Sequence, residues 1–161
     1  MFRGGPIECL ERPEEISLED KMPSLKLSFP VRARDFLAGG HGAARIRQVL
    51  QQVGFPPEII RRAAIAAYEA EMNIIIHSYG GELKAHITPG AITITAVDDG
   101  PGIPDIELAM QEGYSTAPRE IQEMGFGAGM GLPNIRRCAD ELEIKSGAGQ
   151  GTTVNIIIYN R

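Results

Sequence analysis

The sequence predicts an α+β fold, a two-layer α/β sandwich in which helices cover one face of a mixed, mostly antiparallel sheet. Three observations support this prediction. Segments with alternating apolar residues, typical of half-buried strands, occur near the start, in the middle and at the end of the chain. Segments with helical spacing lie between them, and a Pro-Gly pair joins the two central strand segments into a hairpin.

Length and composition predict one soluble domain. The chain has 161 residues, of which 43% are hydrophobic and 23% charged, enough for one packed core and too few for two ordinary domains. A net charge of -5 without a basic run argues against a nucleic-acid or membrane surface. We expect neither a signal peptide nor a membrane span, hence a cytoplasmic location. Cys9 and Cys138 are isolated and predict neither a disulfide nor a zinc site.

Residues 1–24 are rich in Pro, Glu and Gly, and we interpret them as an N-terminal extension that precedes a domain at 25–161. The stretch "LKLSFPV" predicts the first strand, with Pro30 marking its end. The segment "GGHGAARIRQVLQQVG" predicts a helix that stops at Gly54.

A second, unusually apolar helix follows, with Pro56 and Pro57 in its first turn and the pair Gly80 and Gly81 as a left-handed cap. Its composition predicts a central position in the fold.

The second half of the chain begins with the hairpin "ELKAHIT" and "AITITAV" around Pro89 and Gly90. Residues 98–124 are polar and irregular, with one short helical stretch around "DIELAM", and a segment of this length is usually functional. An apolar stripe at helical spacing then predicts a third helix, and "LEIKS" and "TTVNIIIY" predict two closing strands. The stripe consists of Leu132, Ile135, Ala139 and Leu142.

The stretch "MGFGAGMGL" places Gly125, Gly127, Gly129 and Gly131 at alternate positions. It is neither a Walker loop, because no Lys-Ser or Lys-Thr follows, nor a dinucleotide motif, because Met130 stands where the last glycine belongs. Unobstructed backbone N–H groups next to the start of a helix suit phosphate oxygens. The alternative is a flexible loop without a ligand.

The stretch "VDDGPGIPD" follows a strand and contains Asp98, Gly100 and Gly102. A carboxylate at the end of a strand, beside a backbone bare enough for a flat ring, could accept a hydrogen bond from an exocyclic amine. A tight surface turn is the alternative, and this stretch alone favours the turn.

The stretch "YEAEMN" places Glu69 and Asn73 on one face of the second helix, with Glu71 nearly opposite. The glutamate could orient or deprotonate a nucleophile, and the asparagine oxygen could ligate Mg²⁺. A solvent-facing pair joined by a hydrogen bond explains them equally well. His77 shares this face, and a core or capping role is its simplest interpretation.

Together, these features resemble the GHKL ATPases in order and spacing. The matching boxes are Glu69-x-x-x-Asn73, Asp98-x-Gly100-x-Gly102, "GFGAGMGL" and "GAGQGTT", and they span almost the whole domain. The resemblance implies the Bergerat ATP-binding fold. Within these ATPases, the chain is small, and His41 lacks the flanking pattern of the phosphoacceptor histidine of sensor histidine kinases. The chain therefore resembles the small bacterial serine/threonine kinases that act as anti-sigma factors or as switch kinases. Of these two classes, it is more similar to the switch kinases.

The resemblance implies ATP and Mg²⁺ as cofactors. Asp98 would bond the adenine amine above Gly102, Asn73 would hold the metal, and Glu69 would be the catalytic residue. Residues 105–124 would form an ATP lid, with the glycine series as its hinge and phosphate cradle. The implied cofactor-binding residues are Asn73, His77, Asp98, Gly100, Gly102, Ile103, Ser115, Thr116, Gly125, Gly127, Ala128, Gly129, Met130, Gly131, Leu132 and Thr153.

The function implied by the resemblance is phosphorylation of a Ser or Thr on a small regulatory protein of the anti-sigma-factor antagonist type. A sigma factor as a second partner and a homodimer fit the same resemblance. Two alternatives stay open: a nucleotide-gated regulator-binding protein without useful catalysis, and an ATPase subunit of a larger complex.

The sequence departs from the family pattern at two positions. No arginine directly precedes the second glycine box, where Arg119 is the nearest candidate, and Glu71 has no explanation in the pattern.

Overall fold

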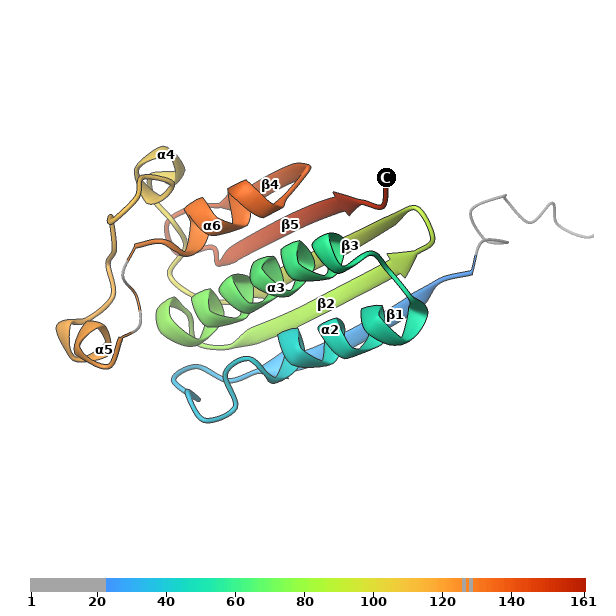
Figure 1. Ribbon diagram of the computed structural model, residues 1–161. Helices are drawn as coiled ribbons and strands as arrows, with labels where there is room; N and C mark the ends of the chain where they lie inside the picture. The colour runs from blue at the N-terminus through green and yellow to red at the C-terminus, as the bar shows by residue number, and fades with distance from the viewer. Residues whose placement is uncertain (1–22, 126, 128) are drawn as a thin grey trace, which may run out of the picture.

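The computed structural model describes residues 23–125, 127 and 129–161, which form one five-stranded sheet with helices on one face (Figure 1). Neighbouring strands follow the order β1-β2-β3-β5-β4, and all four pairings are antiparallel. The strands are β1 (Leu25–Val31), β2 (Gly81–Thr88), β3 (Ala91–Asp98), β4 (Glu141–Ser146) and β5 (Thr152–Tyr159). The helices are α2 (His41–Val53), α3 (Pro57–His77), α4 (Ile106–Ala109), α5 (Arg119–Glu123) and α6 (Gly131–Cys138). The predicted α+β sandwich is confirmed, with a wholly antiparallel sheet instead of a mixed one.

The first described strand, β1, begins at Leu25, the residue at which the sequence predicts that the domain starts. Residues 1–22, which make up most of the predicted N-terminal extension and include Cys9, lie outside the described residues. In the part of the chain that the structure describes, no helix is both long and apolar enough to cross a membrane.

The core lies between one face of the sheet and the helices α2, α3 and α6. Alternate side chains of β2, β3 and β5 point into it, and four isoleucines of β3 and β5 have no solvent exposure: Ile92, Ile94, Ile156 and Ile158. Each such burial contributes about 1.5–3 kcal/mol. Four buried alanines allow α3 to pack closely: Ala63, Ala66, Ala67 and Ala70. As the most apolar helix, α3 contacts the sheet and both other long helices, as its composition predicts.

The predicted start of α3 is confirmed and its predicted end is wrong. Pro56 is the N-cap and Pro57 the first helical residue, as expected. The helix ends at His77, because the hydroxyl of Ser78 donates to the carbonyl of Ile74 (2.7 Å) and takes over the capping role. The glycines that were predicted to form the cap come later: Gly80 has a φ of 134°, and Gly81 already belongs to β2.

Two further boundaries differ from the prediction. Pro30 does not end β1, which continues to Val31; β1 is an edge strand, where a missing N–H leaves no partner strand unpaired. The apolar stripe predicted for the third helix extends too far. α6 ends at Cys138, Ala139 is extended, and Leu142 lies on β4.

Glu71 caps a neighbouring helix, which explains its place in an apolar segment. Only 2% of the residue is exposed, and its carboxylate accepts hydrogen bonds from the backbone N–H groups of Gly40 and Ala43 at the start of α2. α2 has no side-chain cap of its own. A Cβ atom at Gly42 would lie 2.5 Å from the Glu71 carboxylate, so glycine is required for this approach. The charge is favourable at a helix N-terminus and joins α3 to α2.

We predict that Glu71→Ala lowers the free energy of unfolding by about 2–3 kcal/mol, because it leaves buried N–H groups of α2 without an acceptor. Urea denaturation followed by circular dichroism measures this loss. Glu58→Ala, on the same helix, removes an exposed pair with Arg61 and serves as the control, with a much smaller loss expected. Equal losses for the two variants would contradict the capping role.

Candidate functional site

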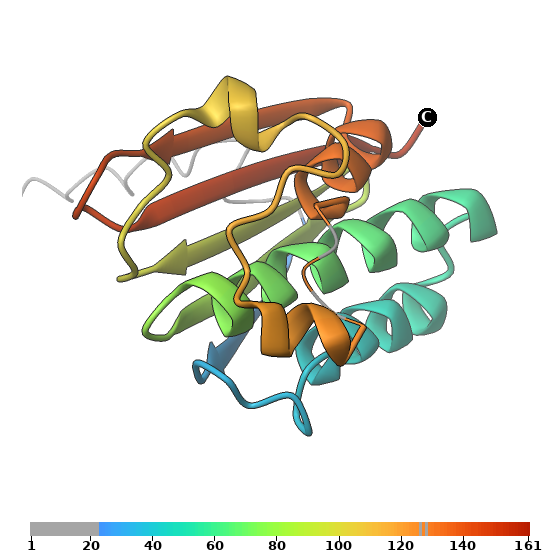
Figure 2. The same ribbon diagram turned by 90° about the vertical axis from the view of Figure 1, so that its left-hand side faces the viewer.

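A cavity of about 760 Å³ lies between α3, the ends of β3 and β5, and the segment that joins β3 to α6. Figure 2 shows this segment, with α4 and α5, crossing in front of α3. The volume falls in the range of small-molecule sites in proteins. The wall contains Glu69, Asn73 and His77, the three residues that the sequence places on one face of α3.

The first turn of α6 faces Glu69 and Asn73 at close range. A Cβ atom at Gly131 would lie 3.2 Å from Glu69 Oε2 and 3.3 Å from Asn73 Oδ1. The Asn134 side chain donates to Glu69 Oε1 at 3.2 Å, which holds the carboxylate toward α6. The glycine therefore keeps open a space bounded by an acid, an amide oxygen and a helix N-terminus. Negatively charged oxygens and a hard cation are the groups that suit such a space.

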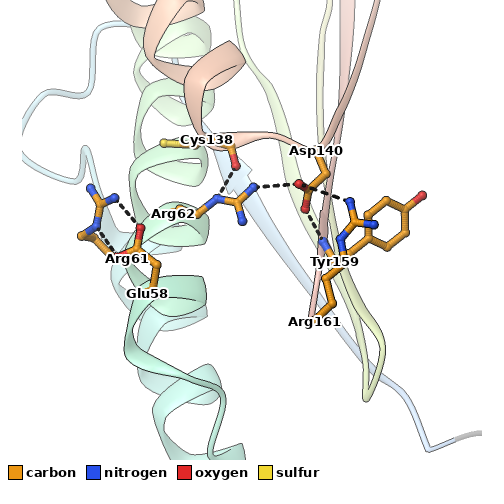
Figure 3. A network of polar contacts seen from close by, with 7 residues as sticks. All are labelled: Glu58, Arg61, Arg62, Cys138, Asp140, Tyr159 and Arg161. Carbon is orange, nitrogen blue, oxygen red and sulfur yellow. Dashed lines mark hydrogen bonds and ion pairs between the residues drawn. The ribbon is translucent and has the colours of Figure 1, made fainter.

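The far end of α6 is fixed to α3 through Arg62. Its guanidinium donates to the carbonyl of Cys138 (2.9 Å), the last residue of α6, and pairs with Asp140 (3.2 Å), as Figure 3 shows. Asp140 also accepts from the backbone N–H of Tyr159 at 2.8 Å, which lowers the pKa of its carboxyl group. Arg161 pairs with Asp140 and lies over the Tyr159 ring. This network joins α3, α6 and β5 away from the cavity.

Asp98 forms the opposite end of the cavity, at the end of β3. Partial burial raises the pKa of its carboxyl group, against the lowering effect of the backbone N–H groups of Gly100 and Thr152. Gly102 also lines the cavity with a φ of 80°, and a Cβ atom there would overlap the Gly147 carbonyl oxygen. The following residue, Ile103, lines the cavity as well and donates its N–H to Ser146 Oγ at 2.6 Å. The Asp98 carboxylate thus lies next to a tightly packed segment of backbone that has no side chain at Gly102.

Two predicted binding residues do not line the cavity. Thr153 lies off the cavity wall, because alternation along β5 turns Thr152 and Val154 inward and Thr153 to the other face of the sheet. Gly100 packs against Ser78 instead, and its N–H donates to Asp98 Oδ1 at 2.8 Å. Ala128 lies outside the described residues.

The other predicted residues of the connecting segment and of the start of α6 lie on the cavity wall: Ser115, Thr116, Gly125, Gly127, Gly129, Met130, Gly131 and Leu132. The glycines at 125, 127 and 129 have φ values of 90°, 70° and 81°, a conformation that side chains rarely adopt. A Cβ atom at Gly129 would overlap the backbone of Gly113 and Tyr114. This segment also contains α5, a short helix that the sequence did not predict.

His77 connects α3 to this segment. Its Nδ1 lies 3.4 Å from Thr116 Oγ1. Burial lowers the pKa of the imidazole, and the charge of Arg34 lowers it further. Both effects favour the neutral form of the ring.

Arg119 does not reach the cavity, which corrects its place as the nearest candidate for a phosphate-binding arginine. Its side chain is 91% exposed and pairs with Glu123 on α5. Sequence reasoning also did not single out several wall residues, although Tyr68, Met72 and Thr152 lie within the quoted stretches "YEAEMN" and "GAGQGTT". Hydrophobic spacing could have suggested only the apolar ones. The wall residues that were not singled out are Arg34, Tyr68, Met72, Ile76, Ala96, Leu108, Ala109, Tyr114, Thr152 and Val154.

The described residues fit ATP and Mg²⁺. Gly131 keeps the approach to Glu69 and Asn73 free of a side chain, Asn73 offers an oxygen ligand, and Asp98 offers an acceptor at the other end of a cavity of suitable volume. Among residues 23–161 without 126 and 128, no group of three or more His, Cys, Asp or Glu could hold a metal. A cation held by one amide oxygen, phosphate oxygens and water is the arrangement that Mg²⁺ favours.

Comparison with known proteins identifies the family. The model of the histidine kinase-like ATPase domain matches residues 41–158, which is most of the chain. The chain belongs to this family. The resemblance to the GHKL ATPases is thereby confirmed.

Two curated relatives are similar to this histidine kinase-like ATPase. The serine/threonine-protein kinase RsbT of Bacillus subtilis (strain 168) is 34% identical over 119 residues, which cover 71% of this chain and 84% of RsbT. The anti-sigma F factor of Thermoanaerobacter sp. (strain X514) is 40% identical over 99 residues. That alignment covers 58% of this chain and 66% of the relative, so it leaves about a third of the relative unmatched.

Two solved structures share the fold. A structure of the SiaB-SiaC complex from Pseudomonas aeruginosa matches 90% of this chain and 100% of the compared chain, with a TM-score of 0.55 and 15% identity. The structure of the RsbU and RsbW domains of Rv1364c from Mycobacterium tuberculosis matches 87% of this chain and 33% of the other, with a TM-score of 0.54 and 19% identity. At these identities, the similarity concerns the fold alone.

We predict that Asp98→Asn weakens binding of MgATP about tenfold or more without lowering the melting temperature at pH 7. The raised pKa of Asp98 means that the folded protein holds this proton more tightly than the unfolded chain does. Ionisation of Asp98 therefore reduces stability as the pH rises through the window above 3.8, and asparagine avoids this loss. Titration calorimetry and thermal melts between pH 4 and pH 7 measure the two effects.

The matched control is Asp99→Asn, because Asp99 is exposed and does not line the cavity. Nucleotide affinity reduced equally by both substitutions would contradict a specific contact by Asp98.

Proposed function

We propose that this chain is an ATP-dependent serine/threonine protein kinase of the anti-sigma-factor or switch-kinase type that phosphorylates a small regulatory protein. The observation that carries the proposal is the position of Glu69 and Asn73, on one face of α3, directly opposite Gly131 at the start of α6. The same cavity contains Asp98 and the lid residues Ser115 and Thr116. The similarity to RsbT, a serine/threonine-protein kinase, supports this assignment.

Asn73 and the first turn of α6 hold the reacting phosphates in this proposal. Asn73 Oδ1 would ligate Mg²⁺, which supplies neutralisation of phosphate charge when it is bound. The backbone N–H groups at the start of α6 would donate to phosphate oxygens. Asp98 would accept a hydrogen bond from the adenine amine and fix the other end of the nucleotide. Phosphoryl transfer depends mainly on such positioning and charge stabilisation.

Glu69 is the proposed catalytic residue. It accepts the proton of the acceptor hydroxyl as the oxygen of that hydroxyl bonds to the γ-phosphorus and the bond from the phosphorus to the ADP oxygen breaks. The hydrogen bond from Asn134 occupies Glu69 Oε1, which leaves Oε2 on the Gly131 side for this proton. The closed glycine-rich segment would keep water away from the reaction.

The proposed acceptor is a protein of the anti-sigma-factor antagonist type, and we place the reaction in the cytoplasm. The similarity to anti-sigma F factors supports a partner of this regulatory class. It also favours a second candidate function, in which nucleotide gates the binding of a sigma factor or another regulator. The two functions differ in their need for Glu69.

We predict that Glu69→Gln reduces phosphate transfer at least 100-fold while MgATP affinity stays within about threefold of the wild type. The substitution removes the base and keeps the shape and the hydrogen-bonding oxygen. The assay is transfer of labelled γ-phosphate from ATP to a panel of purified anti-sigma-factor antagonist proteins, with calorimetry for affinity.

Glu58→Gln, on the exposed first turn of α3, is the control and should transfer phosphate at the wild-type rate. Undiminished transfer by Glu69→Gln would refute the assigned base. Capture of a regulator in a nucleotide-dependent manner by both proteins, without transfer by either, would support the binding function instead.

A further inference from the structure

The cavity wall is short of positive charge. Glu69, Asp98 and Asp105 line it, and Arg34 is the one Lys or Arg side chain among the described wall residues. A nucleoside triphosphate would bring several more negative charges, of which one Mg²⁺ offsets only a part. Among the described wall residues, Arg34 is therefore the side chain whose positive charge can offset the remaining negative charge of the nucleotide.

Arg34 lies in the loop between β1 and α2, at the same end of the molecule as α5 and the C-terminal end of α3 (Figure 1). Its backbone N–H donates to the carbonyl of Ile75 at 2.9 Å, so α3 holds the loop in place. Its φ of 62° is the one positive value among the described non-glycine residues. This conformation is unfavourable for a residue with a Cβ atom, and outliers of this kind concentrate at functional sites.

The loop between β1 and α2 contacts α3 next to Glu69 and Asn73. A Cβ atom at Gly39 would lie 3.1 Å from Met72 Sδ, and one at Gly40 would lie 3.3 Å from the Tyr68 ring. Tyr68 and Met72 are the immediate neighbours of Glu69 and Asn73 along the chain, and both line the cavity. Gly39 and Gly40 thus lie beside the part of α3 that carries Glu69 and Asn73. Arg34 itself is held at Ile75, two residues beyond Asn73.

Arg34 is exposed, and its guanidinium is unpaired among the described residues. In the described part of the chain, no residue gives it a hydrogen bond or an ion pair, whereas Arg61, Arg62 and Arg119 all have acidic partners. Its charge nevertheless acts inside the cavity, because it adds to the burial that lowers the pKa of His77. An unpaired cation at the cavity wall is free to take an anionic ligand.

We propose that Arg34 contacts the terminal phosphate of the bound nucleotide and thereby makes the site discriminate ATP from ADP. This proposal rests on the proposed function, since it requires that the cavity binds ATP. In this proposal, an arginine of the β1–α2 loop contacts the terminal phosphate. Arg119 of the segment between β3 and α6 is not available for this contact, because it pairs with Glu123 outside the cavity.

The test is calorimetric titration of the full-length chain with MgATP and with MgADP. Arg34→Gly removes the guanidinium and suits the positive φ, so it preserves the loop. We expect it to weaken MgATP binding about tenfold and MgADP binding less than twofold, as for loss of one charge-assisted hydrogen bond to the terminal phosphate. Arg34→Lys should retain part of the preference for ATP.

Arg32→Gly is the matched control, because Arg32 is exposed in the same loop and does not line the cavity; both affinities should stay within about twofold of the wild type. The proposal is overturned if Arg34→Gly leaves the ATP-to-ADP affinity ratio unchanged, or if Arg32→Gly changes the ratio equally. Failure of the wild type to bind MgATP would overturn the proposed function as well, so the two failures are distinguishable.

Discussion

The close approach of α6 to the polar face of α3 is the constraint on which the site depends. At Gly131, a single Cβ atom would already contact both Glu69 and Asn73, so the space between the two helices exists only because this residue has no side chain. Arg62 fixes the distance at the other end of α6 through Cys138 and Asp140. The alanine-rich face of α3 lets the helix pack into the core while this polar face stays at the cavity.

Two glutamates two residues apart on α3 perform different tasks. Helical geometry turns them to nearly opposite sides, so Glu71 meets the N-terminus of α2 and Glu69 meets the cavity. The first charge is buried and satisfied by backbone N–H groups, and it adds to stability. The second accepts one hydrogen bond from Asn134 at Oε1, and its other oxygen is the one to which we assign the proposed role as base. The same helix thus joins the core to the cavity.

Local patterns predicted much of this fold, and long-range geometry decided what they missed. Alternation and helical spacing depend on neighbouring residues, so the five strands and three long helices follow from the sequence. The order of the boxes predicted Glu69, Asn73 and Asp98, which the cavity brings together. Thr152 and not Thr153 lines the cavity, because a shift of one residue along a strand reverses the face to which a side chain points. The positions of Glu71 and Arg34 could not be predicted from local patterns, because the residues that they contact in the fold are distant in sequence.

A crystal structure of the full-length chain with Mg²⁺ and a non-hydrolysable ATP analogue is the most direct test of the central claim. The account predicts the triphosphate between Asn73 and the first turn of α6, the metal on Asn73 Oδ1, and the adenine amine on Asp98. A nucleotide bound elsewhere, or bound here with its phosphates at the Asp98 end, would contradict it.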